Sequence, residues 1–220
     1  MIDASVIISY IKSEKTLPVL LAKLEEQDYP RDRFEIILVN GDDYTPRASQ
    51  AKGQIIGIEK SKGRILFFID ADRRPFGNDW ISSHMRYYPR YDLVAGNVVH
   101  HKTPSLQALT FGNISMKREV LESIPINDIV SQQDADFAFR FIKQTKFKGI
   151  LGGSLVWEEE DAKPSWRHDF LCAQNIMVLR RTYKIAPPLS DFEYRLRHPA
   201  TFAGAISGLL FARKIVNAHV

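Results

Sequence analysis

Cysteine is nearly absent from this chain, since Cys172 is the only one among 220 residues. An internal disulfide is therefore excluded, and nothing in the composition argues against a reducing compartment. No apolar run reaches the roughly 18 residues that a membrane-spanning helix needs. The first predicted strand begins at Ala4, which leaves no room for a secretory signal peptide. We therefore expect a cytoplasmic protein.

The chain also lacks internal repeats, low-complexity tracts and an evident linker. Its length is enough for one domain with a sizeable core, and 45% hydrophobic residues are ordinary for a globular protein. The net charge of +4 is a mild basic excess that could serve an anionic ligand or a membrane surface. Because the basic residues are scattered and not interleaved with aromatic residues, we expect no nucleic-acid partner.

The most informative stretch is residues 65–72, ILFFIDAD, in which five large apolar residues precede two carboxylates. A run this short and apolar predicts a strand that is buried on both faces. We expect residues 73–75, RRP, to stop regular structure directly after it. Ligands bind open α/β sheets at the carboxyl ends of strands, and oxygen ligands suit Mg2+ or Mn2+. Asp70 and Asp72 are therefore candidate metal ligands, and a solvated turn is the alternative.

Strand and helix patterns alternate along the chain. Strands at residues 5–10 and 34–39 flank a helix that begins near Thr16, which predicts a βαβ unit with parallel strands. Further helices are expected at 49–62 (stopped by Gly63), 79–88, 117–123, 131–145 and 170–183, and further strands at 65–69, 92–99 and 147–156. The fold class predicted is α/β, with a Rossmann-like, mostly parallel central sheet and helices on both faces.

The order of these features resembles family 2 glycosyltransferases with the GT-A fold. The segments that carry the resemblance are QDYP at 27–30, the small-residue helix from Ala48 to Gly53, DAD at 70–72, GN at 112–113 and QDAD at 133–136. The resemblance covers about residues 4–183. It implies one GT-A domain over 1–190, with a nucleotide-binding half at about 1–75 and an acceptor half at about 76–190.

This resemblance implies an inverting enzyme that moves a sugar from a nucleoside-diphosphate sugar to a hydroxyl of a glycan, a lipid-linked sugar or a small molecule. It implies that Asp72 binds Mn2+ or Mg2+ directly, and that Asp70 contacts the ribose or metal-bound water. Asp134 corresponds to the catalytic base, with a helix N-cap as its alternative role. The donor-binding positions are Ser9, Tyr10, Asn40, Asp42, Lys52 and Asp70, and the acceptor or lid positions are Gln133, Asp136, Asn113 and Trp157.

The chain departs from the family pattern at several of these positions. Residues 9–12 read SYIK where the family usually has Pro-x-x-Asn, and residues 40–43 read NGDD where two adjacent acids are usual. Gln133 stands where the family often has Glu. A histidine often seen after the later strand is absent, and residues 157–158, WE, stand near its place. These changes bear on donor identity and metal binding more than on the type of reaction.

Other side chains admit both a functional and an ordinary interpretation. Arg73 and Lys52 could reach phosphates, although solvated basic residues are more common. The acid run at 158–161 could supply a metal ligand or an acceptor contact, and a solvated loop is the more common case. The adjacent histidines 100–101 could bind a metal, but neighbours on a strand point to opposite faces.

Residues 199–212 form an apolar stretch that is too short to span a bilayer and is flanked by basic residues. The pattern fits a helix in a membrane interface, drawn by anionic lipid. It fits a buried or dimerising helix as well, since Gly204 and Gly208 permit close packing. We therefore predict a helical tail at 191–220 and leave open a homodimer or peripheral contact at the inner face of the cell membrane.

Two other function classes remain. A nucleotidyltransferase acting on sugar phosphates also uses a metal-bound acid pair, but it predicts a Gly- and Arg-rich loop after the first strand, and residues 9–15 contain no glycine. A catalytically inactive GT-A binding module is the non-enzymatic alternative. Metal-dependent turnover of a sugar nucleotide distinguishes the favoured class from the inactive one.

Overall fold

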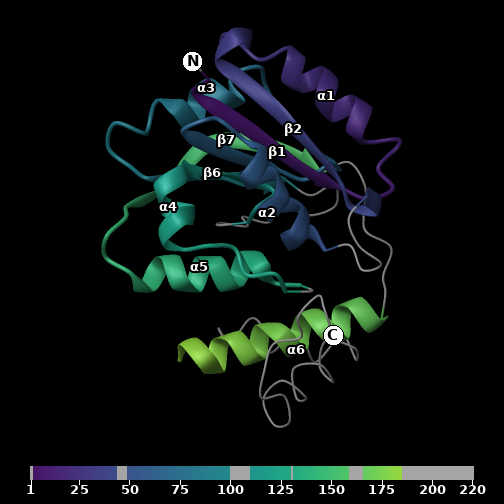
Figure 1. Ribbon diagram of the computed structural model, residues 1–220, viewed down its shortest axis with the longest axis vertical. Coiled ribbons are helices and arrows are strands. Elements are labelled where there is room, and N and C mark those ends of the chain that lie inside the picture. Colours follow the sequence, from purple (N-terminus) through teal and green to yellow (C-terminus); the bar gives the residue numbers. More distant parts are fainter. Residues whose placement is uncertain (1, 44–48, 100–109, 130, 159–165, 185–220) are drawn as a thin grey trace.

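A computed structural model describes residues 2–43, 49–99, 110–129, 131–158 and 166–184 (Figure 1). The predicted tail at 191–220 and the histidines at 100–101 lie outside these ranges. Within the described ranges, no helix combines the length and the apolar character that crossing a bilayer requires.

One mixed sheet forms the centre of the described structure, in the strand order β2-β1-β3-β6-β5-β7-β4. The strands are β1 (Ala4–Tyr10), β2 (Phe34–Asn40), β3 (Ile65–Ile69), β4 (Arg73–Pro75), β5 (Leu93–Val99), β6 (Asn113–Lys117) and β7 (Gly149–Glu158). β1 runs parallel to β2 and β3, and β5 runs parallel to β7. β6 is antiparallel to both β3 and β5, and β4 is antiparallel to β7. The prediction of a mostly parallel sheet is therefore wrong.

The sequence analysis missed β6, and the polar residues of this strand explain why. Asn113 and Ser115 alternate with Ile114 and Met116, yet all four are buried. The hydroxyl of Ser115 lies 2.6 Å from Nδ1 of His84, and Asn113 accepts a hydrogen bond from the indole of Trp80 at 2.8 Å. Because internal hydrogen bonds offset the cost of burying these polar groups, apolar periodicity does not reveal the strand.

A second correction concerns residues 73–75, which we expected to stop regular structure. They form β4 at the end of the strand order, where Arg73 is opposite Glu158 of β7 in the register. Pro75 lacks a backbone N–H, but an edge strand has one side without a strand partner, so proline is tolerated there.

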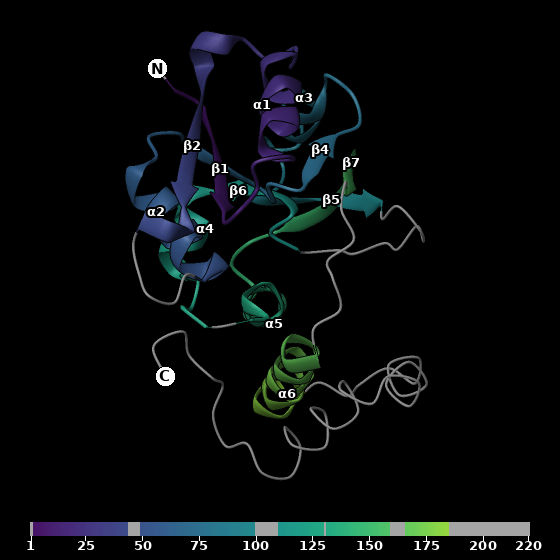
Figure 2. The ribbon, with the colours of Figure 1, turned by 90° about the vertical axis from the view of Figure 1, so that its right-hand side faces the viewer.

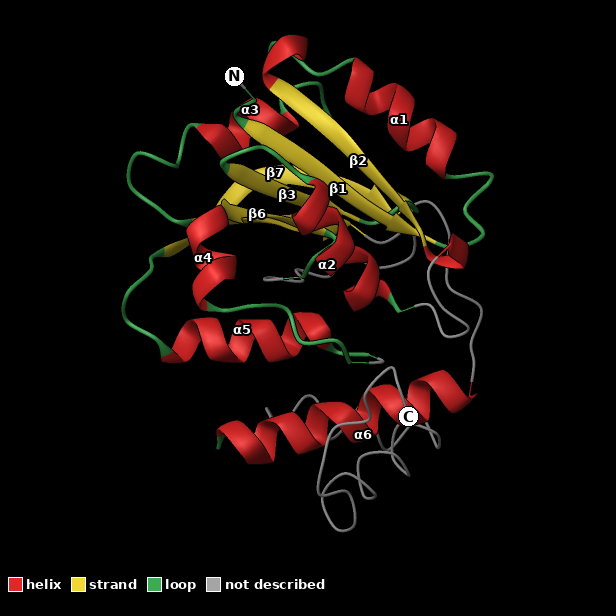
Figure 3. Ribbon diagram, viewed as in Figure 1, coloured by secondary structure: helices red, strands yellow, loops and turns green. Residues whose placement is uncertain are grey.

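Each helix predicted within the described residues is present. The helices are α1 (Leu17–Glu25), α2 (Gln50–Lys60), α3 (Trp80–Met85), α4 (Arg118–Ser123), α5 (Gln133–Lys143) and α6 (Trp166–Tyr183), with 3-10 turns η1 (Arg31–Arg33) and η2 (Gly41–Asp43). Figure 3 shows how these helices surround the sheet. Gly63 follows α2 but does not end it with a left-handed backbone. Glycine fits there because a Cβ would lie 2.6 Å from the backbone of Ala4 and Ser5.

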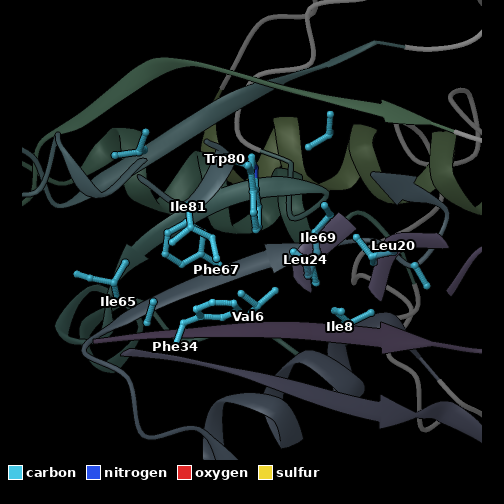
Figure 4. Close-up of a cluster of buried hydrophobic side chains, with 14 of the residues drawn as sticks. Val6, Ile8, Leu20, Leu24, Phe34, Ile65, Phe67, Ile69, Trp80 and Ile81 are labelled. Atoms are coloured by element: carbon cyan, nitrogen blue, oxygen red, sulfur yellow. The ribbon is translucent and has the colours of Figure 1, made fainter. Parts of the chain in front are cut away.

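Alternating side chains of β3 pack into two cores, one on each face of the sheet. Phe67 and Ile69 face α1 and α3 and contact Leu24 and Trp80 (Figure 4). Leu66 and Phe68 belong to the opposite cluster, which side chains of α2, α4 and α5 complete. Burying one such aromatic or aliphatic side chain stabilises the fold by about 1.5–3 kcal/mol. The prediction of helices on both faces is confirmed.

α5 and α6 lie next to each other on the side of the molecule away from α1 (Figure 2). The Tyr183 hydroxyl of α6 donates a hydrogen bond to Oδ1 of Asp136 at 2.9 Å, and the rings of Tyr183 and Phe139 are 5.9 Å apart. Asn175 of α6 also donates to the hydroxyl of Ser131 at 3.2 Å. These contacts hold α6 against the helix that carries the candidate base.

Candidate active site

The carboxyl ends of β1, β2 and β3 meet at one edge of the sheet, because these three strands are parallel. Tyr10 is opposite Asn40 in the register, and Ser9 precedes Tyr10. Since Ile7 is opposite Phe68, Asp70 follows β3 at about the level of Ser9. The structure therefore brings four predicted donor-binding positions to the same edge.

Two further donor-binding positions flank this edge. Asp42 lies in η2, which directly follows β2. Lys52 is half-buried in the first turn of α2, where its backbone N–H donates to the hydroxyl of Ser49 at 3.0 Å. Ser49 in turn donates to Oδ1 of Asp128 at 2.9 Å, which ties the start of α2 to the loop before α5.

Both carboxylate oxygens of Asp70 have protein partners. Nη1 of Arg73 lies 3.0 Å from Oδ2, and the side-chain amide of Gln50 donates to Oδ1. Gln50 accepts in turn from Nε2 of Gln133 at 3.0 Å. A chain of side chains, Gln133 to Gln50 to Asp70, therefore connects the starts of α5 and α2 to the end of β3.

Arg73 lies among acids, and its side chain is only 11% exposed. Besides Asp70, it contacts Oε2 of Glu158 at 3.5 Å and donates to the hydroxyl of Thr110 at 3.2 Å. A Cβ at Gly112 would lie 1.1 Å from Nη1 of Arg73, so this position has no room for a side chain. We call Asp70, Asp72, Arg73 and Glu158 the β3–β4 acid cluster.

Asp72 of this cluster has a buried, open oxygen. Its Oδ1 is buried and has no hydrogen-bond partner among the described residues. Burial, helped by the charges of Asp70 and Glu158, raises the pKa of Asp72 to about 6, while the charge of Arg73 opposes the shift. A buried acceptor without a partner is uncommon and calls for an explanation, such as a ligand.

A divalent cation fits this open oxygen. The described residues contain no cluster of three or more His, Cys, Asp or Glu side chains arranged to hold a metal ion. Mg2+, however, is commonly held by one or two carboxylates together with substrate phosphates, and not by an all-protein cage. Asp72 supplies the free carboxylate oxygen for such a site, whereas Arg73 and Gln50 already occupy Asp70.

Asp134 reaches the same place from the first turn of α5. It is half-buried, and its Oδ1 accepts from the backbone N–H of Ala135 at 2.8 Å. Burial raises the pKa of Asp134, and the charge of Asp70 raises it as well, while the charge of Arg73 opposes the shift. Gln132, just before the helix, has a left-handed backbone with φ of 66°. The next residue, Gln133, bonds to Gln50 and through it to Asp70, so the first turn of α5 lies beside the β3–β4 acid cluster.

Asp136 is buried and held on all sides. Its Oδ2 accepts from Arg140 at 2.6 Å and from Asn127 at 2.8 Å, and its Oδ1 accepts from Tyr183. We call these four residues the α5–α6 clamp. Of the predicted acceptor positions, Asp136 therefore has its oxygens engaged within the protein, while Gln133 lies beside the β3–β4 acid cluster.

The other two predicted acceptor positions differ in their surroundings. Asn113 is buried, accepts from Trp80 and donates to the backbone carbonyl of Asn97 at 2.9 Å. Trp157 is half-buried on β7 and stands opposite Arg74 in the register. Trp157 directly precedes Glu158, which belongs to the β3–β4 acid cluster.

The sequence analysis missed two residues that complete the site. Gln50 carries no motif, and only the fold brings its amide between Asp70 and Gln133. Gly112 belongs to the GN segment, but the sequence does not reveal that Arg73 fills the space of its missing side chain. For Glu158 the sequence left a ligand and a solvated loop open, and the structure gives it a side-chain exposure of 16% beside Arg73.

No protein-family model and no curated protein matches the sequence. The structure is similar to the mannosyltransferase PcManGT from Pyrobaculum calidifontis in complex with GDP-Man and Mn2+, with a TM-score of 0.68 and 16% identity over 95% of this chain and 76% of that one. It is also similar to residues 1–349 of S. aureus TarS in complex with UDP-GlcNAc, with a TM-score of 0.62 and 14% identity over 81% of this chain and 66% of that one. The longer TarS structure is covered over 44% of its length. The chain thus has a GT-A-like glycosyltransferase fold.

Proposed function

We propose that this protein is an inverting family 2 glycosyltransferase that uses a nucleoside-diphosphate sugar and a divalent metal, Mn2+ or Mg2+. The observation that carries the proposal is the open, buried oxygen of Asp72 at the carboxyl edge of the parallel strands, together with the hydrogen bonds that link the start of α5, where Asp134 lies, to Asp70. The PcManGT and TarS structures hold GDP-Man and UDP-GlcNAc on the same fold, which supports a nucleotide sugar as donor.

On the donor side, Asp72 would hold the cation. When bound, the cation neutralises the negative charge that develops on the leaving phosphate. Asp70, oriented by Arg73 and Gln50, would bind the ribose hydroxyls or metal-bound water. Ser9, Tyr10, Asn40 and Asp42 would contact the nucleoside, and Lys52 would bind a phosphate from the first turn of α2.

On the acceptor side, Asp134 would take the proton of the acceptor hydroxyl as its oxygen attacks the anomeric carbon. One such displacement inverts the anomeric configuration and needs no nucleophilic side chain. The raised pKa of Asp134 makes its carboxylate a stronger base, as general-base catalysis requires. Gln133 and Asp136 would fix the first turn of α5. Asn113 would support the binding edge of the sheet through its buried hydrogen bonds. Trp157 would stack on the acceptor sugar.

The acceptor is proposed to be a glycan, a lipid-linked sugar or a small molecule. Residues 1–190 would form the catalytic domain, and 191–220 would attach the protein to the inner face of the cell membrane or form a homodimer. Flotation with anionic liposomes and sedimentation of full-length and truncated protein test the two roles of the tail. A full-length chain that neither floats nor dimerises contradicts both.

The decisive experiment incubates the protein with a panel of sugar nucleotides, with Mn2+ or with chelator, and measures the nucleoside diphosphate released. We expect Mn2+-dependent release from at least one donor and its loss in Asp72→Ala. Equal release with chelator would contradict the metal site, and no release from any donor would contradict the proposal. Release of pyrophosphate from a nucleoside triphosphate and a sugar phosphate would support the nucleotidyltransferase alternative.

A further inference from the structure

Two successive residues, where the turn after β3 leads into β4, each leave one buried polar atom open. Oδ1 of Asp72 is an acceptor, and Nε of Arg73 is a donor, and neither has a hydrogen-bond partner among the described residues. An unsatisfied buried donor costs free energy, so proteins rarely keep one without a role. An open acceptor and an open donor thus belong to adjacent residues of the β3–β4 acid cluster.

The other nitrogens of Arg73 are already engaged. Nη1 contacts Asp70 at 3.0 Å and Thr110 at 3.2 Å, and Nη2 contacts Glu158 at 3.5 Å. The antiparallel pairing of β4 with β7 also fixes the backbone of Arg73. The guanidinium is therefore held in place before any ligand arrives, and its Nε edge is what remains for one.

One type of ligand satisfies both open atoms. A cation on Oδ1 of Asp72 needs further hard oxygen ligands, and Nε of Arg73 needs an anionic or carbonyl oxygen as acceptor. A diphosphate supplies several negatively charged oxygens on two adjacent phosphorus atoms, so it can serve the cation and the guanidinium together. Charge-assisted bonds from arginine to phosphate are among the stronger hydrogen bonds in proteins.

We propose that Arg73 is a diphosphate-binding residue, which holds the leaving group of the donor through its Nε edge beside the cation at Asp72. The inference rests on the proposed function and adds to it a residue that no motif of the chain assigns. Its positive charge also acts on the nearby acids, since it opposes the upward pKa shifts of both Asp72 and Asp134. The charge of Arg73 should therefore repel Mn2+ alone but attract a nucleoside diphosphate.

These opposite effects define the test. Calorimetry measures the affinity for UDP and for GDP with Mn2+ present, and electron paramagnetic resonance of free Mn2+ measures the affinity for the metal alone. In Arg73→Gln we expect nucleotide affinity to fall about tenfold or more, because a charge-assisted bond is lost. We expect the affinity for Mn2+ alone to stay the same or rise, because Asp70 and Glu158 lose a competing cation.

Two further variants separate charge and geometry from a general loss of structure. Arg73→Lys keeps the charge but lacks the planar fork, so Mn2+ affinity should stay as in the wild type while nucleotide affinity still falls. Arg74→Gln removes the same charge from the next residue of β4, whose side chain points to the opposite face. That control should change either affinity by less than about twofold.

The outcomes are distinct. If the wild type binds UDP or GDP with Mn2+ and Arg73→Gln binds it equally well, the inference is wrong while the proposed function stands. If Arg73→Gln loses metal and nucleotide binding together with its thermal transition, Arg73 is a structural residue and the inference is wrong as well. If the wild type binds neither nucleotide with Mn2+, the proposed function fails and the inference fails with it.

Discussion

Two groups of buried charged side chains in this protein differ in how their polar atoms are satisfied. In the α5–α6 clamp, both oxygens of Asp136 accept hydrogen bonds from within the protein. In the β3–β4 acid cluster, Asp72 and Arg73 each leave a buried atom open. Buried acids in the same protein can therefore have opposite effects. Groups whose hydrogen bonds are satisfied within the protein stabilise the fold, whereas groups with an open atom lower its stability and are available to a ligand.

Asp134 precedes Asp136 of the clamp by two residues on α5. Its substitution should have the largest effect on activity. Asp134→Asn keeps the shape of the side chain but cannot accept the proton of the acceptor. We expect the transfer rate to fall by roughly 10²–10⁴, the usual range for loss of general-base catalysis. Affinity for the donor should barely change, because the β3–β4 acid cluster is intact.

The measurement for Asp134→Asn is transfer rate and donor affinity on the same preparation, with Asp136→Asn alongside. Normal transfer by Asp134→Asn contradicts the assignment, as does loss of donor binding as severe as in Asp72→Ala. If Asp136→Asn folds normally and is the inactive variant, the base lies two residues further along α5.

Breaking the α5–α6 clamp should give the largest effect on stability. Asp136→Asn removes the charge that Arg140, with a side chain 18% exposed, contacts at 2.6 Å. We expect the free energy of unfolding to fall by about 3 kcal/mol, the low end for breaking a buried ion pair, because Arg140 is partly exposed. Urea denaturation measures this change.

The matched control for the clamp is Tyr183→Phe, which removes only the hydroxyl that donates to Asp136. The loss of that one hydrogen bond should cost about 1 kcal/mol. Equal and negligible losses for both variants would mean that the clamp contributes nothing to stability.

Asp72→Asn should instead raise the free energy of unfolding, because burying this carboxylate destabilises the fold. Its pKa rises from 3.8 to about 6 on folding, so the folded state binds the proton more tightly than the unfolded one. The free energy of unfolding contributed by this group therefore falls as the pH rises from about 4 to about 6, and stays low above that. A shift of about two units corresponds to roughly 3 kcal/mol.

In metal-free buffer, Asp72→Asn should lack this pH-dependent loss and should unfold at a higher urea concentration than the wild type at pH 7. Added Mn2+ should stabilise the wild type and leave the variant unchanged. The stability of the wild type and of the variant is compared between pH 4 and pH 6. If both rise by the same amount, the cost assigned to Asp72 is contradicted.

The first half of the fold was predictable from the sequence because its information is local. Each of β1, β2 and β3 is a short apolar run, and the acids directly after β3 mark the edge where ligands bind. The second half was less predictable. β6 buries Asn113 and Ser115 through contacts with Trp80 and His84 that are some thirty residues away in the sequence.

The candidate site divides in the same way. Asp70, Asp72 and Asp134 stand in short motifs, so the sequence alone could nominate them. Gln50, and the space at Gly112, became visible only in the folded chain, because their partners come from other elements. Pattern reasoning also could not tell that Asp136 would be engaged while Asp72 stays open, since both follow the same Asp-x-Asp spacing.

Gly112→Ala should have a moderate effect that sharpens the role of Arg73. The new Cβ would lie 1.1 Å from Nη1 of Arg73 and 2.6 Å from Oδ2 of Asp70, so the guanidinium must move. We expect a loss of stability of about 1–3 kcal/mol, as for overpacking a core, and weaker binding of UDP or GDP with Mn2+. Calorimetry that shows unchanged nucleotide affinity in a folded Gly112→Ala protein would mean that the position of Arg73 does not matter.

The smallest effect is expected at Gln50, the exposed residue that links the β3–β4 acid cluster to the start of α5. Its amide donates to Asp70 and accepts from Gln133, so Gln50→Ala removes two hydrogen bonds between α2, β3 and α5. Each is worth about 0.5–1.5 kcal/mol at most, and exposure to water lowers that value. Stability should therefore change by less than about 1 kcal/mol.

Because the base helix loses its link to the donor site, we expect the transfer rate to fall severalfold, about as much as one such bond allows. Glu59→Ala, an exposed change near the end of α2, is the control and should leave the rate unchanged. A Gln50→Ala protein with the wild-type rate would show that Asp134 and Asp70 are held in place independently of each other.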